Sequence, residues 1–412
     1  MGRIAAAVIL LQFLVAAFVL AQESPGAEPA EETTAQKLAG KYGWPYVAGH
    51  KGLSRQEIFF PLVRGLQVIK ADLHIHTIYS DGQVLPETRV WEAWRDGLDL
   101  MVITDHPEYL KLALPQDRER AYGRALPLAR ALGLMLVRGA ELTTLSGPTY
   151  KDEDSDHVVA FIQDESPFFG DFDTAVRSAR DQGAVIIWAH PGSRWVRDAT
   201  RLLKLGWLDG IELRNGGRKG GKGIGYHRGE PYFSEVMDWC LDHDLAVIAS
   251  SDAHWPIDQM VDRGRGERRE MTLVLAERRG ETSIREAIKA RRTLAYFGEM
   301  IWGREEWLRA LAESSLRFSV TPSIQENRKR HFLSVANSSS FPFRMKVSRA
   351  GDESAAGLRE VRIAERGRTV APVSVKEGET GVRLVITVTN LLSGADRPLI
   401  LERRLQVPGG PP

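Results

Sequence analysis

The chain has little cysteine and no excess of charge of either sign. Among its 412 residues there is a single Cys, at position 240, which excludes an intramolecular disulfide framework and any Cys-rich zinc or iron–sulfur site. Its 55 Lys and Arg residues are balanced by 54 Asp and Glu residues, so a broad nucleic-acid-binding surface is not expected. If the protein binds a metal, His and carboxylate side chains must hold it, and the chain has ten His.

The N-terminus begins with a positively charged residue and a short apolar run. Arg3 precedes residues 4–20, which are apolar except for Gln12, and Val19-Leu20-Ala21 is an acceptable cleavage sequence. This pattern predicts a secretory signal peptide over residues 1–21 of an exported, periplasmic or secreted bacterial protein, with no membrane association after cleavage. An uncleaved anchor is the alternative. Residues 22–60 are expected to form a tether and N-terminal extension.

From residue 66 to 276, short β-type runs alternate with amphipathic stretches. The runs are 66–73, 98–104, 134–140, 158–162, 184–189, 210–213, 246–249 and 271–276, and the helix-like stretches are 87–96, 117–132, 174–182, 233–242 and 284–290. Ser283 with Glu286 suggests a capping box at the start of the last helix. The alternation predicts an α/β fold with a parallel barrel over residues 61–303. A doubly wound open sheet is the alternative, although no G-x-G-x-x-G follows the first strand.

The sequence pattern changes after residue 303. A helix-like stretch at 305–314 precedes seven short runs separated by turn residues, at 316–320, 332–335, 343–347, 361–364, 370–375, 382–388 and 399–405. Short strands with regular turn signals are typical of antiparallel β domains. Residues 304–412 are therefore expected to form a small antiparallel, sandwich-like C-terminal domain.

Five histidines lie at the ends of predicted strands. They occur in Asp72-Leu-His-Ile-His76, Thr104-Asp-His106, Ala189-His190 and Ser251-Asp-Ala-His254, and the acidic residues Glu141 and Asp252 lie at strand ends as well. Residues at the C-terminal strand ends of a parallel barrel converge on one mouth. His157 instead opens a run, so periodicity alone does not place it there.

Imidazole and carboxylate ligands together suit borderline divalent ions such as Mn, Fe or Zn. A carboxylate can bridge two such ions about 3.5–4 Å apart, and the pair can clamp the attacking and leaving oxygens of a phosphoryl group. The strand-end set as a whole is therefore interpreted as a metal centre. Any one of these histidines taken alone could be a core residue bonded to a backbone carbonyl.

At these residues the sequence resembles the polymerase and histidinol phosphatase (PHP) family of metallohydrolases. Their H-x-H with a following S-D-G, then T-D-H, G-A-E, two isolated His and S-D-x-H are matched in order from Ala71 to His254. The resemblance implies a distorted (β/α)7 TIM-like barrel with two or three divalent metal ions. It places His74, His76, Glu141 and Asp252 on one metal, with Glu141 bridging to a second that is also held by His157 and His190. It assigns a third to Asp81, His106 and His254.

Motifs that are less specific than the metal ligands resemble exported bacterial phosphodiesterases of this family, which act on small organophosphate diesters. They are Arg269-Glu-Met-Thr-Leu-Val, Ala290-Arg-Arg-Thr293, the Trp239-Cys240 helix and Asn337-Ser-Ser…Phe341-Pro-Phe343. One departure is a long basic, glycine-rich loop at 216–231, whose Arg218, Lys219, Lys222 and Arg228 could neutralise a substrate phosphate, with His227 as a further contact. The alternative is a solvated surface loop.

The predicted function is metal-dependent hydrolysis of a small anionic phosphodiester, with a hydroxide that bridges the metals held by Glu141 and Asp252 attacking phosphorus. Asp105 and Asp156, each next to a ligand His, are candidates for orienting imidazoles. A phosphomonoesterase on the same site is the nearest alternative, and a non-catalytic binding module stapled by metals is another. A nucleic-acid substrate is not expected.

Overall fold

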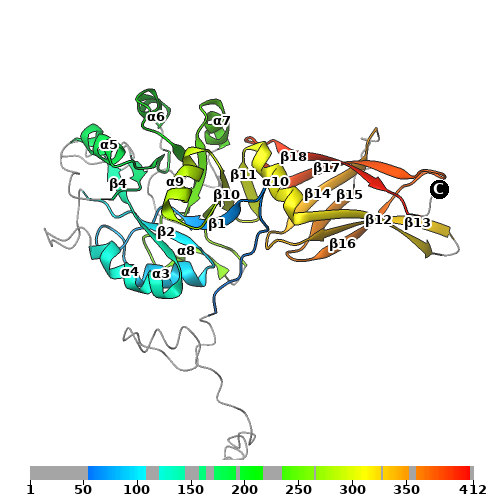
Figure 1. Cartoon of the computed structure of the whole chain (residues 1–412), viewed down its shortest axis with the longest axis horizontal. Coiled ribbons are helices and arrows are strands. Elements are labelled where there is room, and N and C mark those ends of the chain that lie inside the picture. Colours follow the sequence, from blue (N-terminus) through cyan, green and yellow to red (C-terminus); the bar gives the residue numbers. More distant parts are fainter. Residues whose placement is uncertain are drawn as a thin grey trace, which may run out of the picture. The chain divides into compact units, whose positions relative to one another are not determined.

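The structure, a computed structural model of the whole chain, describes residues 54–107, 120–143, 157–163, 171–191, 195–216, 234–263, 266–325, 328–351 and 359–408 (Figure 1). Several predicted features lie outside these ranges. They are the signal peptide at 1–21, most of the following extension, Asp156, and the basic loop from residue 217 onward with Arg218, Lys219, Lys222, His227 and Arg228.

The first part of the described chain alternates strands with helices, as the sequence predicts. Its strands are β1 (Gln67–Asp72), β2 (Leu100–Ile103), β3 (Met135–Arg138), β4 (Ala140–Thr143), β5 (His157–Ala160), β6 (Ile186–Trp188), β7 (Gly210–Asn215), β8 (Ala246–Ser250), β9 (Met271–Ala276), β10 (Thr293–Phe297) and β11 (Met300–Gly303). Its helices are α3 (Pro86–Arg95), α4 (Arg120–Leu132), α5 (Phe172–Asp181), α6 (Trp195–Lys204), α7 (Ser234–Asp242), α8 (Ile257–Met260) and α9 (Glu281–Lys289).

Local chemistry explains where several helices begin and end. Helix α3 has Pro86 at its first position, Glu87 in its first turn and Arg95 in its last, the order that matches the helix dipole. Helix α5 is capped by Asp171, whose side chain accepts from the Thr174 amide. The predicted capping box in α9 is wrong, because that helix begins earlier, at Glu281 after Gly280, and has no side-chain cap.

The strands form mixed sheets rather than a parallel one. One sheet runs β15-β14-β17-β11-β10-β9-β1-β2-β3 with β18 beside β17, and another runs β4-β5-β6-β7-β8. The prediction of parallel strands is correct for β1–β2–β3 and β6–β7–β8. It is wrong for β1–β9–β10 and for β4–β5–β6, which are antiparallel.

The described strands do not close into a barrel, so the expected TIM-like closure is not seen. Gly139 alone separates β3 from β4, and there the chain passes from one sheet to the other. Beyond β1 and β8 the sheets meet through an isolated bridge between Ile75 and Ala253 instead of a full ladder. Gly139 lies close to Glu141, and the Ile75–Ala253 bridge lies next to His74, His76 and Asp252. The fold therefore places these predicted site residues at the boundary between the two sheets.

Both faces of the strands are covered by buried apolar side chains. Ile69, Leu73, Val159, Ile187 and Ile248 belong to one buried cluster, which α9 also joins. A second cluster packs α5, α6 and α7 against the opposite face and includes the buried Cys240. Burial on both faces explains why these strands are continuous apolar runs. Among the helices of the described residues, none is long and apolar enough to span a bilayer.

The C-terminal region is rich in antiparallel strands, as predicted. After α10 (Glu305–Ser315) come β12 (Leu316–Gln325), β13 (Arg328–Asn337), β14 (Phe343–Arg349), β15 (Arg359–Ile363), β16 (Arg368–Val373), β17 (Gly381–Leu392) and β18 (Pro398–Gln406). They pair as β12-β13-β16 and as β15-β14-β17-β18. A short parallel pairing of β17 with β11 makes the second group continuous with the first part of the chain (Figure 1). Residues 55–412 form one compact unit, and the predicted boundary at residue 303 stays a prediction.

Candidate metal centre

The two histidines of the H-x-H motif follow β1 and lie on the same side of the extended chain. The backbone around them is fixed by the segment after β8, because the Asp252 amide donates to the His74 carbonyl at 2.9 Å and the His76 amide to the Ala253 carbonyl at 3.1 Å. This pairing places Asp252 beside both imidazoles. All three side chains are buried.

The antiparallel direction of β5 explains the position of His157. It begins β5 and pairs with Thr143, the last residue of β4. The start of an antiparallel strand lies beside the end of its neighbour, so His157 reaches the same end of the sheet as Glu141. The sequence could not indicate this, because its periodicity is the same for either strand direction.

Four ligand atoms converge at the end of β1. One atom each from His74, His76, Glu141 and Asp252 lies within 4.8 Å of all the others. Glu141 Oε2 is 3.0 Å from His74 Nε2 and 2.9 Å from His76 Nε2. Asp252 Oδ1 is 3.3 and 3.2 Å from the same two nitrogens. The structure therefore brings together the four residues that the resemblance assigns to a first metal.

The other carboxylate oxygen of Glu141 faces a second pair of imidazoles. Oε1 lies 3.0 Å from His157 Nδ1 and 2.9 Å from His190 Nε2. Glu141 is almost fully buried, so each of its oxygens is committed to a different group of histidines. A bridging carboxylate needs this arrangement.

Asp81, His106 and His254 lie next to the first group. Asp81 Oδ2 is 3.1 Å from His254 Nε2 and 3.9 Å from His106 Nε2. His106 Nε2 is also 3.2 Å from Glu141 Oε2, so His106 stands between two groups. Its ligand atom clusters with those of His76 and Asp81 and, in another combination, with those of Glu141 and His157.

Close backbone packing explains the glycine of the S-D-G segment. A Cβ atom on Gly82 would lie 2.7 Å from the His76 carbonyl carbon and from the Thr77 amide nitrogen, closer than such atoms approach. Glycine therefore lets the loop that carries Asp81 fold against the backbone of His76.

Two residues of the centre have unusual backbone angles. His190 has φ of 22° and Asp252 has φ of 47°, in the region that residues with a Cβ rarely adopt. The surrounding hydrogen bonds hold both, and strain of this kind is concentrated at functional sites.

The close packing of acids and imidazoles shifts their pKa values in opposite directions. Burial favours neutral imidazoles, but Asp81, Asp252 and Glu141 outweigh it and raise the pKa of His76 to about 10. Likewise Glu141 raises the pKa of His190 to about 9 against the effect of burial. Although burial opposes it, the surrounding imidazoles hold the pKa of Glu141 and of Asp252 well below the ordinary carboxyl value.

His106 behaves differently. Burial lowers its pKa to about 3, and the neighbouring His76 and His157 contribute to the decrease despite the opposing effect of Glu141. A neutral imidazole with a free lone pair is the form that ligates metals. This side chain is therefore already in that form at neutral pH.

The donor set fits a divalent metal ion. Nitrogen and carboxylate oxygen are the ligands of Mn, Fe and Zn, and no thiol takes part. Asp252 Oδ1 is buried without a hydrogen-bond partner among the described residues although imidazole nitrogens surround it. In the neutral form in which imidazoles ligate metals, these rings no longer balance the charge of the oxygen, and a bound cation would do so.

Buried polar residues support the centre from outside. The fully buried Arg89 donates to the carbonyls of His76, Ala253 and Trp255. Arg269 pairs with Asp72 at 2.7 Å. Arg89 is not predictable from the sequence as a member of the site, because an arginine on an amphipathic helix is usually exposed.

Asp105 supports the loop after β1 rather than an imidazole directly. Its side chain accepts from the Thr77 amide at 2.7 Å and from the Ser80 hydroxyl at 2.6 Å, and Ser80 Oγ lies 3.3 Å from His76 Nδ1. Asp105 thus reaches His76 through Ser80, and its role in orienting an imidazole stays a prediction.

Glu212 was also missed. This residue of β7 is fully buried and lies 3.0 Å from His74 Nδ1. A signal was present in the sequence, since an acidic residue in the apolar run 210–213 must find a buried partner.

The chain is similar to proteins of known sequence and structure. A solved structure of a two-domain protein from Bacteroides vulgatus, which contains a predicted PHP-like metal-dependent phosphoesterase, matches with a TM-score of 0.72 and 32% sequence identity, over 85% of this chain and 99% of that one. The chain belongs to the PHP-like metal-dependent phosphoesterase family. Because the match leaves out only 15% of this PHP-like chain, it includes residues of both the ligand-bearing part and the β-rich C-terminal region.

A second relative is the DNA polymerase/3'-5' exonuclease PolX of Bacillus subtilis. It is 30% identical over 142 residues, which are 31% of this chain and 24% of PolX. The PHP-like chain thus spans about a quarter of that relative's length, and the activities in that relative's name are not transferred to it. No protein-family model matches the chain.

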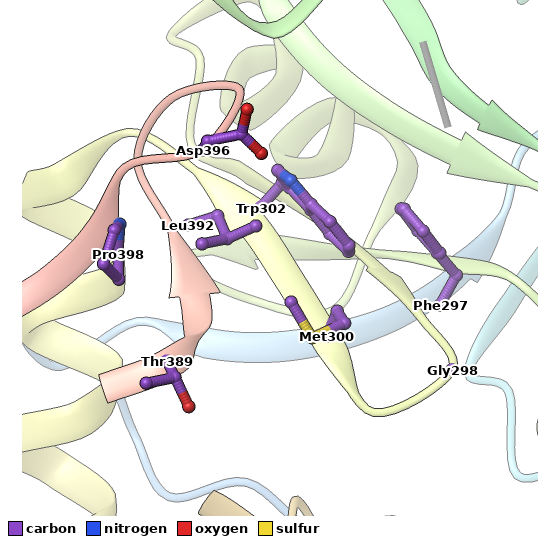
Figure 2. Close-up of a pocket in the computed structure, with 8 residues that line it drawn as sticks. All are labelled: Phe297, Gly298, Met300, Trp302, Thr389, Leu392, Asp396 and Pro398. Atoms are coloured by element: carbon purple, nitrogen blue, oxygen red, sulfur yellow. The ribbon is translucent and has the colours of Figure 1, made fainter. Parts of the chain in front are cut away.

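A separate apolar cavity of about 500 Å³ lies between the β10–β11 hairpin and the end of β17 (Figure 2). Phe297, Met300, Trp302, Leu392 and Pro398 line it, and the rings of Phe297 and Trp302 stack with centroids 4.2 Å apart. None of the described residues lining it belongs to the predicted ligand set, so this cavity is not the metal centre.

Proposed function

We propose that the protein hydrolyses a small phosphodiester at a centre of two or three divalent metal ions, with the ligands His74, His76, Asp81, His106, Glu141, His157, His190, Asp252 and His254. The observation that carries the proposal is the division of Glu141, whose Oε2 faces His74 and His76 and whose Oε1 faces His157 and His190. This division supports two adjacent metal positions.

When bound, such ions supply a water nucleophile at neutral pH and neutralise charge on the phosphoryl oxygens. The chain contributes the preorganised ligands and excludes bulk water from the buried side chains of the first group. Thr77, Ser80 and Asp105 hold the loop that presents Asp81. The proposed reaction breaks one P–O bond and adds one water to give a monoester and an alcohol.

The buried arginines favour a diester over a monoester. Arg89 donates to three backbone carbonyls and pairs with Glu92, and Arg269 is paired with Asp72. Within the part of the chain that the structure describes, these two arginines beside the ligand loops are therefore bound to protein groups. A monoester dianion needs more cationic stabilisation than a diester monoanion, and these two side chains are not placed to supply it. The resemblance to exported phosphodiesterases supports the same choice.

The proposal includes export. The apolar N-terminal run after Arg3 supports a signal peptide cleaved after about Ala21. Sequencing the N-terminus of the protein recovered from its native host tests this proposal. Recovery of a chain that begins near Gln22 is the expected result, and recovery of the intact Met1 terminus contradicts cleavage.

A substrate panel tests the activity. Purified full-length protein is reconstituted with Mn²⁺ and assayed with a nitrophenyl phosphodiester and with the corresponding monoester. The expected result is hydrolysis of the diester that is abolished by a chelator and restored by Mn²⁺. Turnover of the monoester alone would instead support a phosphatase.

The His74→Ala variant distinguishes a catalytic metal centre from metals that only stabilise the fold. Metal loss with a parallel loss of diester hydrolysis is expected, because His74 Nε2 lies in the first ligand group. Metal loss with unchanged hydrolysis would show that the activity arises elsewhere. Exposed Arg309, which pairs with Glu305 on the surface of α10, provides the control variant Arg309→Ala.

A further inference from the structure

Glu212 is a fully buried carboxylate that contacts both halves of the proposed centre. Its Oε1 lies 3.0 Å from His74 Nδ1, and its Oε2 accepts from the His190 backbone amide at 2.8 Å. The Asn215 side chain donates to the same Oε2 at 2.8 Å. Neither the resemblance nor the ligand set gives this residue a role.

The contact with His74 determines which nitrogen of the ring is available. A carboxylate oxygen is the acceptor of this contact and a ring N–H is its donor, so Nδ1 is the nitrogen of His74 that is turned toward Glu212. The lone pair of a neutral His74 is then on Nε2, the atom 3.0 Å from Glu141 Oε2. Carboxylates that bind the distal nitrogen of a ligand histidine fix the orientation of its ring in this way.

The contact with His190 acts through the backbone. His190 has φ of 22°, a conformation that needs support from its surroundings. The amide held by Glu212 belongs to this residue, and its ring places Nε2 2.9 Å from Glu141 Oε1. One carboxylate therefore supports a histidine on each side of the Glu141 carboxylate.

We propose that Glu212 is a positioning residue that aligns the ligand atoms of His74 and His190, so that both proposed metal positions depend on it. This inference rests on the metal ligation in the proposed function. It adds a coupling, because one substitution away from the ligands is expected to weaken both positions together.

A purely structural role is the competing explanation, and Asp209 provides the matched control. Asp209 immediately precedes β7, is also buried, and accepts from the Ile186 amide at 3.0 Å and from Arg180 at 2.6 Å. It is thus a buried acid with a comparable number of donors next to the same strand, but it contacts none of the ligands through these bonds. Asp209→Asn should affect folding without affecting metal affinity.

The experiment compares Mn²⁺ binding by calorimetry in full-length wild type, Glu212→Gln and Asp209→Asn. Glutamine keeps the size of the side chain, but its NH₂ group must face one of the donors that Glu212 accepts from. Mn²⁺ affinity is expected to fall about 10–100-fold in Glu212→Gln and to stay at the wild-type level in Asp209→Asn. Thermal unfolding of the metal-free proteins measures the structural effect of each variant.

Histidine-selective ¹⁵N spectra of the zinc-loaded proteins give a second readout. Wild type is expected to show His74 protonated on Nδ1, and Glu212→Gln to show a changed Nδ1 signal. If Glu212→Gln does not fold, Glu212→Asp is the second variant. It keeps the charge but is too short to span His74 and the His190 amide, and it is expected to bind Mn²⁺ more weakly than wild type.

Three results would overturn the inference: wild-type Mn²⁺ affinity in Glu212→Gln, wild-type affinity in Glu212→Asp, or an equal loss of affinity in Asp209→Asn. Failure of the proposed function is distinguishable, because it would appear in the wild-type protein itself, as absence of Mn²⁺ binding or of diester hydrolysis.

Discussion

At the scale of single residues, the two oxygens of Glu141 connect the groups of the centre. Each oxygen is within about 3 Å of imidazoles from different parts of the chain, His74 and His76 on one side and His157 and His190 on the other. These imidazoles share a single buried carboxylate, so their protonation and their capacity to bind metal are linked.

The first prediction concerns proton release. In the metal-free protein the pKa of His76 is raised to about 10 and that of His190 to about 9 by neighbouring carboxylates, against the effect of burial. Both rings are protonated at neutral pH and must lose a proton to bind a metal. Mn²⁺ affinity should therefore rise with pH up to about pH 9–10.

The stability of the metal-free protein depends on pH in the opposite direction. A raised folded-state pKa stabilises the metal-free protein below the unfolded value of about 6.5, and this contribution is lost as the pH rises through 9–10.

Calorimetric Mn²⁺ titrations at pH 7, in buffers of different ionisation enthalpy, measure the protons that are released when the metal binds. A heat that is independent of the buffer would contradict the prediction.

The second prediction concerns Gly82. A methyl group there would collide with the His76 and Thr77 backbone at 2.7 Å, so Gly82→Ala should cost about 1–3 kcal/mol of stability and weaken Mn²⁺ binding by displacing the Asp81 loop. Gly123→Ala is the control, because its Cβ would meet nothing within 4 Å and alanine favours a helix. Denaturant unfolding and Mn²⁺ titration measure both effects, and equal behaviour of the two variants would contradict the explanation.

The sequence was sufficient to predict residues whose chemistry is unusual for their position. His74, His76 and Asp252 are polar groups at the ends of apolar runs. Polar groups that are buried beside such runs need partners or a ligand. Arg89 and Glu212 were missed for a physical reason as well. Their roles depend on which distant carbonyls and imidazoles pack against them, and one sequence does not contain that information.

At the scale of elements, the direction of β5 was not predictable. Alternation of strands and helices favours parallel neighbours, but both β4–β5 and β5–β6 are antiparallel. The reversal gives His157 its place beside Glu141. The resemblance assigned His157 correctly to the neighbourhood of Glu141 where strand patterning could not.

Helix α3 supplies the third prediction. Its Arg89 joins the loop after β1 to the loop after β8 through the carbonyls of His76, Ala253 and Trp255. Arg89→Met would remove the guanidinium donors from these three carbonyls and from the buried Glu92. A loss of about 3–5 kcal/mol in the free energy of unfolding is expected, together with weaker Mn²⁺ binding.

Arg309→Ala is the matched control for Arg89→Met. Arg309 also pairs with an acid of its own helix, Glu305 of α10, but this pair is exposed, so the expected loss is below about 1 kcal/mol. Denaturant unfolding compares the two variants. A loss below about 1 kcal/mol for Arg89→Met as well would show that Arg89 does not hold the loops together.

At the scale of the whole molecule, the β-rich C-terminal region contributes to the same sheet as the metal centre. Strand β17 pairs with β11, and Leu392 joins the buried cluster of Phe297 and Trp302. The sequence predicted the change in strand pattern near residue 303 but not the pairing of β17 with β11. The register between strands ninety residues apart is set by tertiary packing.

The fourth prediction follows from this pairing. A chain that ends at residue 303 would leave β11 as an unpaired edge and would expose Trp302, which is 1% exposed in the whole chain. Lower thermal stability and aggregation are expected for this fragment. An unfolding midpoint equal to that of the full chain would contradict it and would support an independent domain up to residue 303.

The central claim is that Glu141 holds two groups of metal ligands together, and metal content tests it most directly. Elemental analysis after dialysis against Mn²⁺ and removal of free metal compares wild type with Glu141→Gln, with the exposed Glu281→Gln as the control. The account predicts about two or more Mn²⁺ ions per chain for wild type and for the control, and the loss of at least one ion in Glu141→Gln, since an amide offers a single acceptor oxygen. The same metal content in Glu141→Gln as in wild type would contradict it.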